Sequence, residues 1–325
     1  AVVAGRQNGF KDKDNRDLAE GIAKVYRESV DMFAKQPLLD VWYYHVEAEK
    51  ILTLFDRYSK KGAKYTKKMI KKARSKTQAI TLEKISEVID GKRRFINDPP
   101  LLVRLDDLLT EEQKDLFNQQ HLRNTWIEDI SSLPEERRLL LSRFRMADSA
   151  LRVGGVGSVG THCTILLVEG GAEGDALILQ QKEAGPSVLE AYLPKREYAS
   201  SAQRVVIAQR LMQATSDIFL GWHQSAISDR HYYWRQLKDM KGSVDVAALD
   251  ETGLGTYLAV CSLCLARAHA RTGDPAGIAG YLGKGATFDK AIAKFAIAYA
   301  NQTERDYQTL VEAVKSGRIS AEIGI

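Results

Sequence analysis

Three glycines and a lysine in the middle of the chain have the residue types and order of a phosphate-binding site. Gly155, Gly157 and Gly160, with Ser158 between them, form a G-x-G-x-x-G motif, and Lys182 follows at the end of an apolar run. Glycine lets backbone amides approach a phosphate closely because no side chain intervenes. A lysine then supplies a point charge for the phosphate oxygens. These residues predict a cradle for nucleotide phosphates.

The surrounding residues decide between known uses of such a motif. A dinucleotide-binding fingerprint requires a helix after the last glycine, but residues 161–168 are β-branched and apolar and predict a strand. A Walker loop requires lysine directly after that glycine, where Thr161 stands. A kinase-type loop lies between two antiparallel strands and is followed by a strand bearing a lysine, which is the order found here. A tight hairpin with a solvated Lys182 remains the alternative.

A lysine that holds phosphates in a kinase needs a carboxylate to orient it. Glu183 and Glu190 are the acidic residues available nearby. Glu190 also completes a Ser187-x-x-Glu190 capping box, so either role is open. The predicted helix 201–215 contains no glutamate, unlike the corresponding helix of a conventional protein kinase.

Two further groups of polar residues are candidates for the same site. Arg235 and Asp239 lie at and just after the last predicted strand, between two blocks of the chain. His269 and Arg271 end a predicted helix beside Gly273, where they could line a cleft or equally cap the helix. No residue is assigned a catalytic role, and Cys261-x-x-Cys264 is interpreted as part of a helix face rather than a metal site.

The elements that must position these residues fall into three blocks, and the predicted fold class is α+β. Residues 1–145 are expected to be helical. Residues 146–241 are expected to form a small antiparallel sheet with the glycine loop, Lys182 and one helix. Residues 242–325 return to helix and are expected to pack with the first block.

Composition limits the broad class of protein. The 325 residues are 44% hydrophobic and 27% charged, with a formal net charge of +5. No apolar run is long enough to span a bilayer, and three cysteines do not make a disulfide framework, so a cytoplasmic protein is expected. Residues 57–94 hold fourteen Lys and Arg against three acidic residues. A solvated helix face is the more common meaning of such a run, so nucleic acid is not expected as a partner.

Several motifs along the whole chain resemble a bacterial family known as domain of unknown function 2252. They are found at residues 155–161, 182–190, 209–222, 235–241 and 268–274. Members of that family carry a further N-terminal segment with Gly-Asp-x-His-x-x-Asn and Asp-Phe-Asp motifs, similar to those of aminoglycoside and choline kinases. The resemblance implies a circularly permuted kinase-like fold and a chain that lacks its first segment, with the catalytic base and metal ligands.

The expected function follows from the loop and the resemblance together. We expect a kinase-like protein that binds ATP with Mg²⁺ and, when full length, transfers a phosphoryl group to an acceptor that the sequence does not identify. This chain alone is expected to be inactive, because it contains neither an Asp-x-x-x-x-Asn loop nor an Asp-Phe-Gly or Asp-Phe-Asp motif. The alternative is a non-catalytic protein that binds a nucleotide or another anionic partner.

Overall fold

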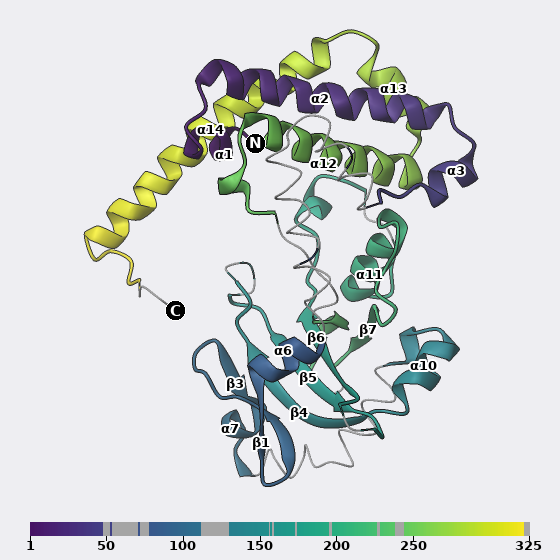
Figure 1. Ribbon diagram of the computed structural model, residues 1–325, viewed down its shortest axis with the longest axis vertical. Coiled ribbons are helices and arrows are strands. Elements are labelled where there is room, and N and C mark those ends of the chain that lie inside the picture. The colour runs from purple at the N-terminus through teal and green to yellow at the C-terminus, as the bar shows by residue number, and fades with distance from the viewer. Residues whose placement is uncertain are drawn as a thin grey trace. The chain divides into compact units, whose positions relative to one another are not determined.

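The chain divides into two compact units in a computed structural model (Figure 1). The helical unit comprises residues 1–73, 211–214 and 242–324, and the sheet unit comprises residues 74–210 and 215–241. The structure describes residues 1–47, 53, 71, 78–111, 130–155, 157, 159–172, 174–194, 197–225, 228–237 and 244–321. Among these residues no helix is both long and apolar enough to cross a membrane.

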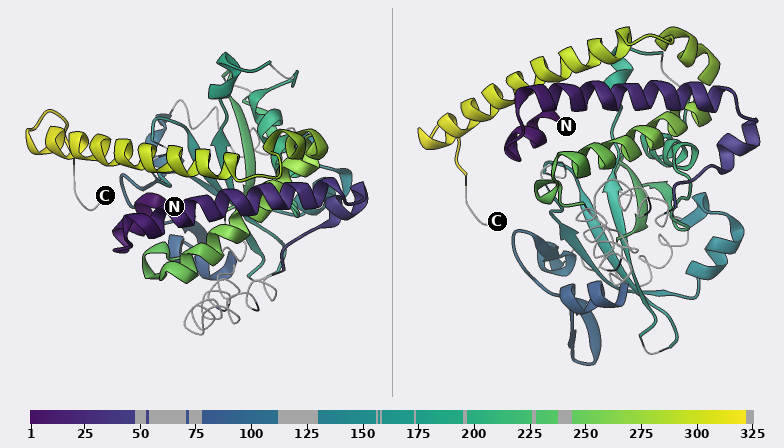
Figure 2. Two further views of the ribbon diagram at one scale, coloured as in Figure 1. Left: turned by 90° about the horizontal axis from the view of Figure 1, so that it is seen from above. Right: turned by 45° about the horizontal axis from the view of Figure 1, so that its top comes forward.

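The helical unit is built from helices that lie near the two ends of the sequence. Its helices are α1 (Val2–Gln7), α2 (Asp12–Ala34), α3 (Leu38–Tyr43), α12 (Glu251–Thr272), α13 (Pro275–Leu282) and α14 (Thr287–Lys315), with a short 3-10 turn η4 (Val246–Ala248). Helix α2 lies between α12 and α14 (Figures 1 and 2). Asp250 caps α12 by accepting from the Gly253 amide, and Asp274 caps α13 in the same way, so both starts follow from the sequence.

Small residues let these helices approach closely. Ala19 on α2 packs with Ala293 and Ala300 on α14 and with Val2 on α1. A second cluster holds α2 to α12 and α13, and it consists of Val30, Phe33, Val41, Ala266, Ala270 and Leu282. Most of these side chains recur three or four positions apart along their helices, which is the spacing of one helix face.

The sheet unit contains a six-stranded antiparallel sheet and a two-stranded hairpin. The large sheet has the order β3-β4-β5-β6-β8-β7. Its strands are β3 (Leu102–Arg104), β4 (Arg145–Arg152), β5 (Cys163–Glu169), β6 (Ala176–Glu183), β7 (Gly221–Gln224) and β8 (His231–Gln236). The hairpin pairs β1 (Ser86–Ile89) with β2 (Lys92–Phe95). The helical elements of this unit are α6 (Gln78–Ile85), α7 (Leu105–Leu108), η1 (Ile130–Ser132), α10 (Glu135–Leu141), η3 (Val188–Ala191) and α11 (Ser201–Met212).

Each face of the large sheet has its own apolar core, as alternation of side chains along a strand requires. Ile165, Leu167 and Ile178 lie on one face, with Phe95 of the hairpin packed against them. Leu166, Val168 and Leu179 lie on the other, around Trp234. The part of the sheet nearest the glycine loop is therefore fixed by buried packing on both sides.

The α+β class predicted from the sequence is confirmed, but the helical character of residues 1–145 is wrong in part. Strands β1, β2 and β3 and the first residue of β4 fall inside that range. The hairpin turns at Asp90 and Gly91, both with positive φ (50° and 74°), which is the geometry of a two-residue turn that favours Asp-Gly. Most of the basic run at 57–94 lies outside the described residues.

Candidate functional site

The glycine-rich segment connects β4 to β5, as a kinase-type loop would require. Gly155 and Gly160 have positive φ angles, 144° and 80°, which a residue with a side chain adopts only with strain. No atom lies within 4 Å of the position where a Cβ would stand at Gly155, Gly157 or Gly160, so nothing packs against the loop at these points. Ser158 lies outside the described residues. The positive φ angles explain why glycine stands at these positions in a hairpin, and the same open backbone also allows a ligand to approach it.

Lys182 lies on the strand next to the end of this loop. In the ladder it is directly opposite Cys163, the first residue of β5, and on its other side it is opposite Tyr233 of β8. Its side chain is half-buried. Because Cys163 comes three residues after Gly160, the register places the lysine backbone beside the loop.

Two arginines share the sheet face of Lys182. Tyr233 of β8 pairs with Lys182, and Arg235 lies two residues further along β8, so it points to the same face. Ala150 of β4 pairs with Ile165 on that face, and Arg152 lies two residues further along β4, so it points there too. Burial raises the pKa of the Cys163 thiol between them, while the charges of Lys182, Arg152 and Arg235 act to lower it. All three cations therefore surround one buried position, and Arg152 is a member that the sequence analysis did not identify.

These three cations have no counter-charge in the part of the chain that the structure describes. No ion pair within 4 Å is formed by Arg152, Lys182 or Arg235 there. The Nε atom of Arg235 is buried without a hydrogen-bond partner. Partly buried cations without partners are costly, because they lose hydration without a compensating interaction. An anion bound at this face would relieve that cost.

Glu183, one of the two carboxylates considered for Lys182, is used on the opposite face. It accepts from the His162 amide at 3.1 Å, lies 2.9 Å from His162 Nδ1 and accepts from Arg230 at 2.9 Å. The hydrogen bond with the His162 side chain is the main reason that the pKa of Glu183 is lowered. Consecutive residues on a strand point to opposite faces, so Glu183 does not share a face with Lys182.

Glu190, the other carboxylate, completes the capping box that the sequence predicted. Its Oε1 accepts from the Ser187 amide at 2.9 Å, and Ser187 Oγ accepts from the Leu189 amide at 3.3 Å. It also lies 3.7 Å from Nε of Arg204, which belongs to α11. The helix that lacks glutamate thus carries the positive partner of an ion pair. Asp239 lies outside the described residues.

His269 and Arg271 belong to the helical unit, whereas Lys182 belongs to the sheet unit. His269 Nδ1 is 2.7 Å from the hydroxyl of Tyr26, whose ring it meets edge-on. The guanidinium of Arg271 stacks 3.6 Å from the ring centre of Trp42 and donates to the carbonyl of Gln213. The neighbouring Arg267 donates to the carbonyl of Met212, so both arginines bond to backbone carbonyls of residues 211–214 of the same unit.

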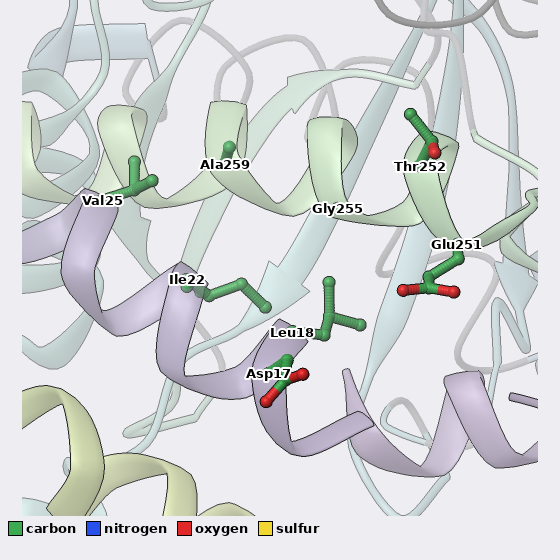
Figure 3. A pocket seen from close by; sticks show the side chains of 9 residues that line it. Asp17, Leu18, Ile22, Val25, Glu251, Thr252, Gly255 and Ala259 are labelled. Atoms are coloured by element: carbon green, nitrogen blue, oxygen red, sulfur yellow. The ribbon is translucent and has the colours of Figure 1, made fainter. Parts of the chain in front are cut away.

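An apolar groove of the helical unit lies between α2 and α12. Two adjoining hollows of about 400 and 460 Å³ share Val25, Thr252, Gly255 and Ala259. Figure 3 shows Leu18 and Ile22 along one side and Asp17 and Glu251 at one end. None of the residues predicted for the phosphate site lines this groove.

Metal ligands do not cluster among the described residues, where no group of three or more His, Cys, Asp or Glu side chains is placed to hold an ion. The arrangement around Lys182 is suited to binding an anion electrostatically. It provides backbone amides in a glycine loop and three side-chain cations.

Comparison with known proteins gives a family. No match was found among curated proteins or solved structures. A family model described as an uncharacterized protein conserved in bacteria matches residues 1–313, which is nearly the whole chain. The chain therefore belongs to this bacterial family, domain of unknown function 2252.

Proposed function

We propose that the sheet unit binds the phosphates of a nucleotide and that the protein is a kinase-like ATP-binding protein. The observation that carries the proposal is the group of three half-buried cations, Arg152, Lys182 and Arg235, on one sheet face beside the glycine loop. A polyphosphate spreads its charge over several oxygens and suits three cations and a row of amides better than a single carboxylate does.

The order of elements supports the kinase-like part of the proposal. Strand β4, the glycine loop, β5, the lysine-bearing β6, helix α11 and two further strands follow one another as in a kinase small lobe. The departure is at α11, where a kinase has a glutamate that pairs with the lysine and this chain has Arg204 paired with Glu190. In the proposed site, Arg235 and Arg152 bind phosphate oxygens together with Lys182.

Phosphoryl transfer to an unidentified acceptor, with Mg²⁺, belongs to the same proposal. Transfer requires an acid that positions the nucleophile and oxygen ligands that hold the metal. The sequence of 325 residues contains neither of the usual motifs for these roles. That observation favours a second candidate, a protein that binds nucleotide without turning it over.

The test is titration calorimetry with Mg-ATP and with pyrophosphate. Replacing Lys182 or Arg235 by alanine removes a charged partner worth about 1.5–3 kcal/mol, so affinity falls roughly tenfold or more. Lys92→Ala, which removes an exposed cation from the β1–β2 hairpin, is the matched control and leaves affinity unchanged. Absence of binding to either ligand at millimolar concentration, or equal binding by all three variants, would show that the proposal is wrong.

Measurement of ATP consumption separates the two candidates. A nucleotide-binding protein without turnover gives binding that depends on Lys182 and no phosphate release. Turnover that is lost in Lys182→Ala would establish the transferase and would place the catalytic acid within this chain.

A further inference from the structure

Helix α14 carries a stripe of large exposed apolar side chains that the helical unit does not cover. Phe295, Tyr299 and Tyr307 are 62%, 62% and 61% exposed, and Ile292 and Leu310 are 38% and 51% exposed. The rings of Phe295 and Tyr299 stack on each other at 5.6 Å. A helix of 3.6 residues per turn places positions 292, 299, 303 and 310 on one face, with 295 and 307 at its two edges.

The second half of α14 has little support from the rest of the unit. Every residue from Asn301 to Leu310 is exposed, so this stretch touches few neighbours on any side. Glu304 forms an ion pair with Arg6 of α1, at 2.8 Å. This half extends beyond the other helices of the unit (Figures 1 and 2). Short helices without tertiary packing are marginal in water, so a partner would stabilise it.

The stripe is symmetric about Asn301. Ile292 and Leu310 each lie nine residues from it, Phe295 and Tyr307 each lie six, and Tyr299 and Thr303 each lie two. When two such helices lie antiparallel and cross at Asn301, Ile292 of one helix lies at the level of Leu310 of the other. In the same way Phe295 lies at the level of Tyr307, and Tyr299 at the level of Thr303. A surface that complements itself in this way is the mark of a two-fold interface.

We propose that α14 pairs antiparallel with α14 of a second copy of this chain, through the stripe of Ile292, Phe295, Tyr299, Tyr307 and Leu310. The proposal is independent of the phosphate site. Charge favours this orientation over a parallel one. Asp306 is the one charged residue on the stripe's face, and in the antiparallel pair it comes to the level of the partner's Ala296. In a parallel pair the two Asp306 carboxylates would meet, which is unfavourable.

Three cations of the helix lie in solvent, away from the stripe. Lys290, Lys294 and Arg305 are exposed and lie on the face opposite the stripe. An anionic membrane would attract those cations, but it would have to bury the stripe on the other side of the helix. The positions of the charges thus favour a protein partner with the same apolar pattern.

The exposed area predicts a weak, reversible dimer. Aromatic side chains present about 150–250 Å² each, so three that are somewhat over half exposed, with Ile292 and Leu310, offer on the order of 450 Å² per copy. That lies at the low end for specific interfaces. We expect a dissociation constant of roughly 10–100 µM.

Sedimentation equilibrium of the full chain between micromolar and several hundred micromolar tests the proposal. The unmodified chain shifts from monomer to dimer over this range. Tyr299→Glu weakens the dimer tenfold or more, because it places a charge at the centre of the stripe. Lys294→Glu, an exposed change on the opposite face, is the matched control and leaves the dimer unchanged. Tyr299 and Lys294 are both exposed, and circular dichroism confirms that each variant is folded.

A second substitution tests the antiparallel arrangement. Thr303→Lys added to Tyr299→Glu recovers part of the affinity, because each new ammonium then lies at the level of the other copy's new carboxylate. A chain that stays monomeric throughout the range, or a dimer that Tyr299→Glu does not weaken, overturns the proposal. A dimer that is weakened by the first change and not recovered by the second overturns the antiparallel pairing.

Discussion

At the scale of single residues, the proposed phosphate site shows which signals a sequence carries. Lys182 was predicted because an apolar run with glycines before it marks a strand and its end. Arg235 was predicted from its position between two blocks, and the structure gives the reason for its place, since it shares a face with Tyr233 and Lys182. Arg152 was missed because the strand expected before the glycines was given no residue range, and the face of a side chain is defined only once the strand's residues are.

Glu183 gives a prediction about pH. Its pKa is lowered in the folded protein, first by the hydrogen bond with His162 and also by Arg230. A carboxyl with a depressed folded pKa stabilises the fold above its unfolded pKa, and this contribution is lost as the pH falls through the folded value. Glu183→Gln should therefore cost about 1 kcal/mol at pH 7, since the group is partly exposed.

The measurement is urea unfolding of both proteins at pH 7 and near pH 3. The difference between them should shrink at the lower pH, because the carboxylate's contribution is lost as the pH falls toward its depressed folded pKa. Glu169→Gln, at the far end of the neighbouring strand β5, serves as the control. A difference that persists unchanged into acid would mean that Glu183 acts through packing rather than through its charge.

At the scale of elements, some strands of the sheet were predictable and others were not. Strand β5 lies close to its predicted range of 161–168, β6 carries Lys182 near its end and β8 contains Arg235, because β-branched and apolar runs bounded by glycine or polar turns mark these strands. Strand β4 has the sequence Arg-Met-Ala-Asp-Ser-Ala-Leu-Arg, whose Ala, Met, Leu and Arg favour helix. It is a strand because β3 and β5 pair with it on both sides, and tertiary pairing overrides propensity.

The hairpin β1–β2 depends on its turn, and a substitution there measures this. Gly91 has φ of 74° with no atom near the position of a Cβ, so a side chain would meet backbone strain and no clash. Gly91→Ala should therefore destabilise the sheet unit by about 1 kcal/mol. Gly91→Asn should cost less, because asparagine tolerates this conformation better than alanine does.

Thermal unfolding of the two Gly91 variants beside the unmodified chain makes the comparison. Because both variants add a side chain at the same open position, a difference between them reports backbone conformation. Equal losses for alanine and asparagine would contradict the role assigned to the positive φ. Asp90 and Gly91 form an Asp-Gly pair, which is a turn signal, so this hairpin was predictable from the sequence although residues 1–145 were expected to be helical.

At the scale of the whole molecule, the helical unit is assembled from the two ends of the sequence. Residues 1–73 and 242–324 form one unit, while almost all of the residues between them form the other. Sequence periodicity predicted helices in both end segments, but it does not say which helices meet. That information lies in long-range contacts, such as the packing of Ala19 against Ala293, which no local pattern specifies.

A buried ion pair joins the two ends within this unit. Arg27 of α2 donates to Asp289 of α14 through Nε at 3.0 Å and through a terminal nitrogen at 2.8 Å. Asp289 is 1% exposed and Arg27 is 8% exposed. The hydrogen bond that Arg27 donates to Asp289 is the main cause of a raised pKa at Arg27, so the guanidinium stays charged in the folded state. Neither group has access to much water.

Asp289→Asn tests how far the unit depends on this pair. The substitution leaves the Arg27 charge buried without a counter-charge, and breaking a buried pair in this way costs about 3–5 kcal/mol. Glu312→Gln, an exposed change on the same helix, is the control and should stay within about 0.5 kcal/mol of the unmodified chain.

Replacing both partners, with Arg27→Met and Asp289→Leu together, should recover most of the loss, because apolar side chains of similar size remove the need for a counter-charge. Denaturant unfolding followed by helix content measures all three. If the double variant is as unstable as Asp289→Asn, the joint between the two ends rests on the hydrogen bonds of this pair themselves, including the one from Arg27 to the Lys284 carbonyl, rather than on the balance of buried charge.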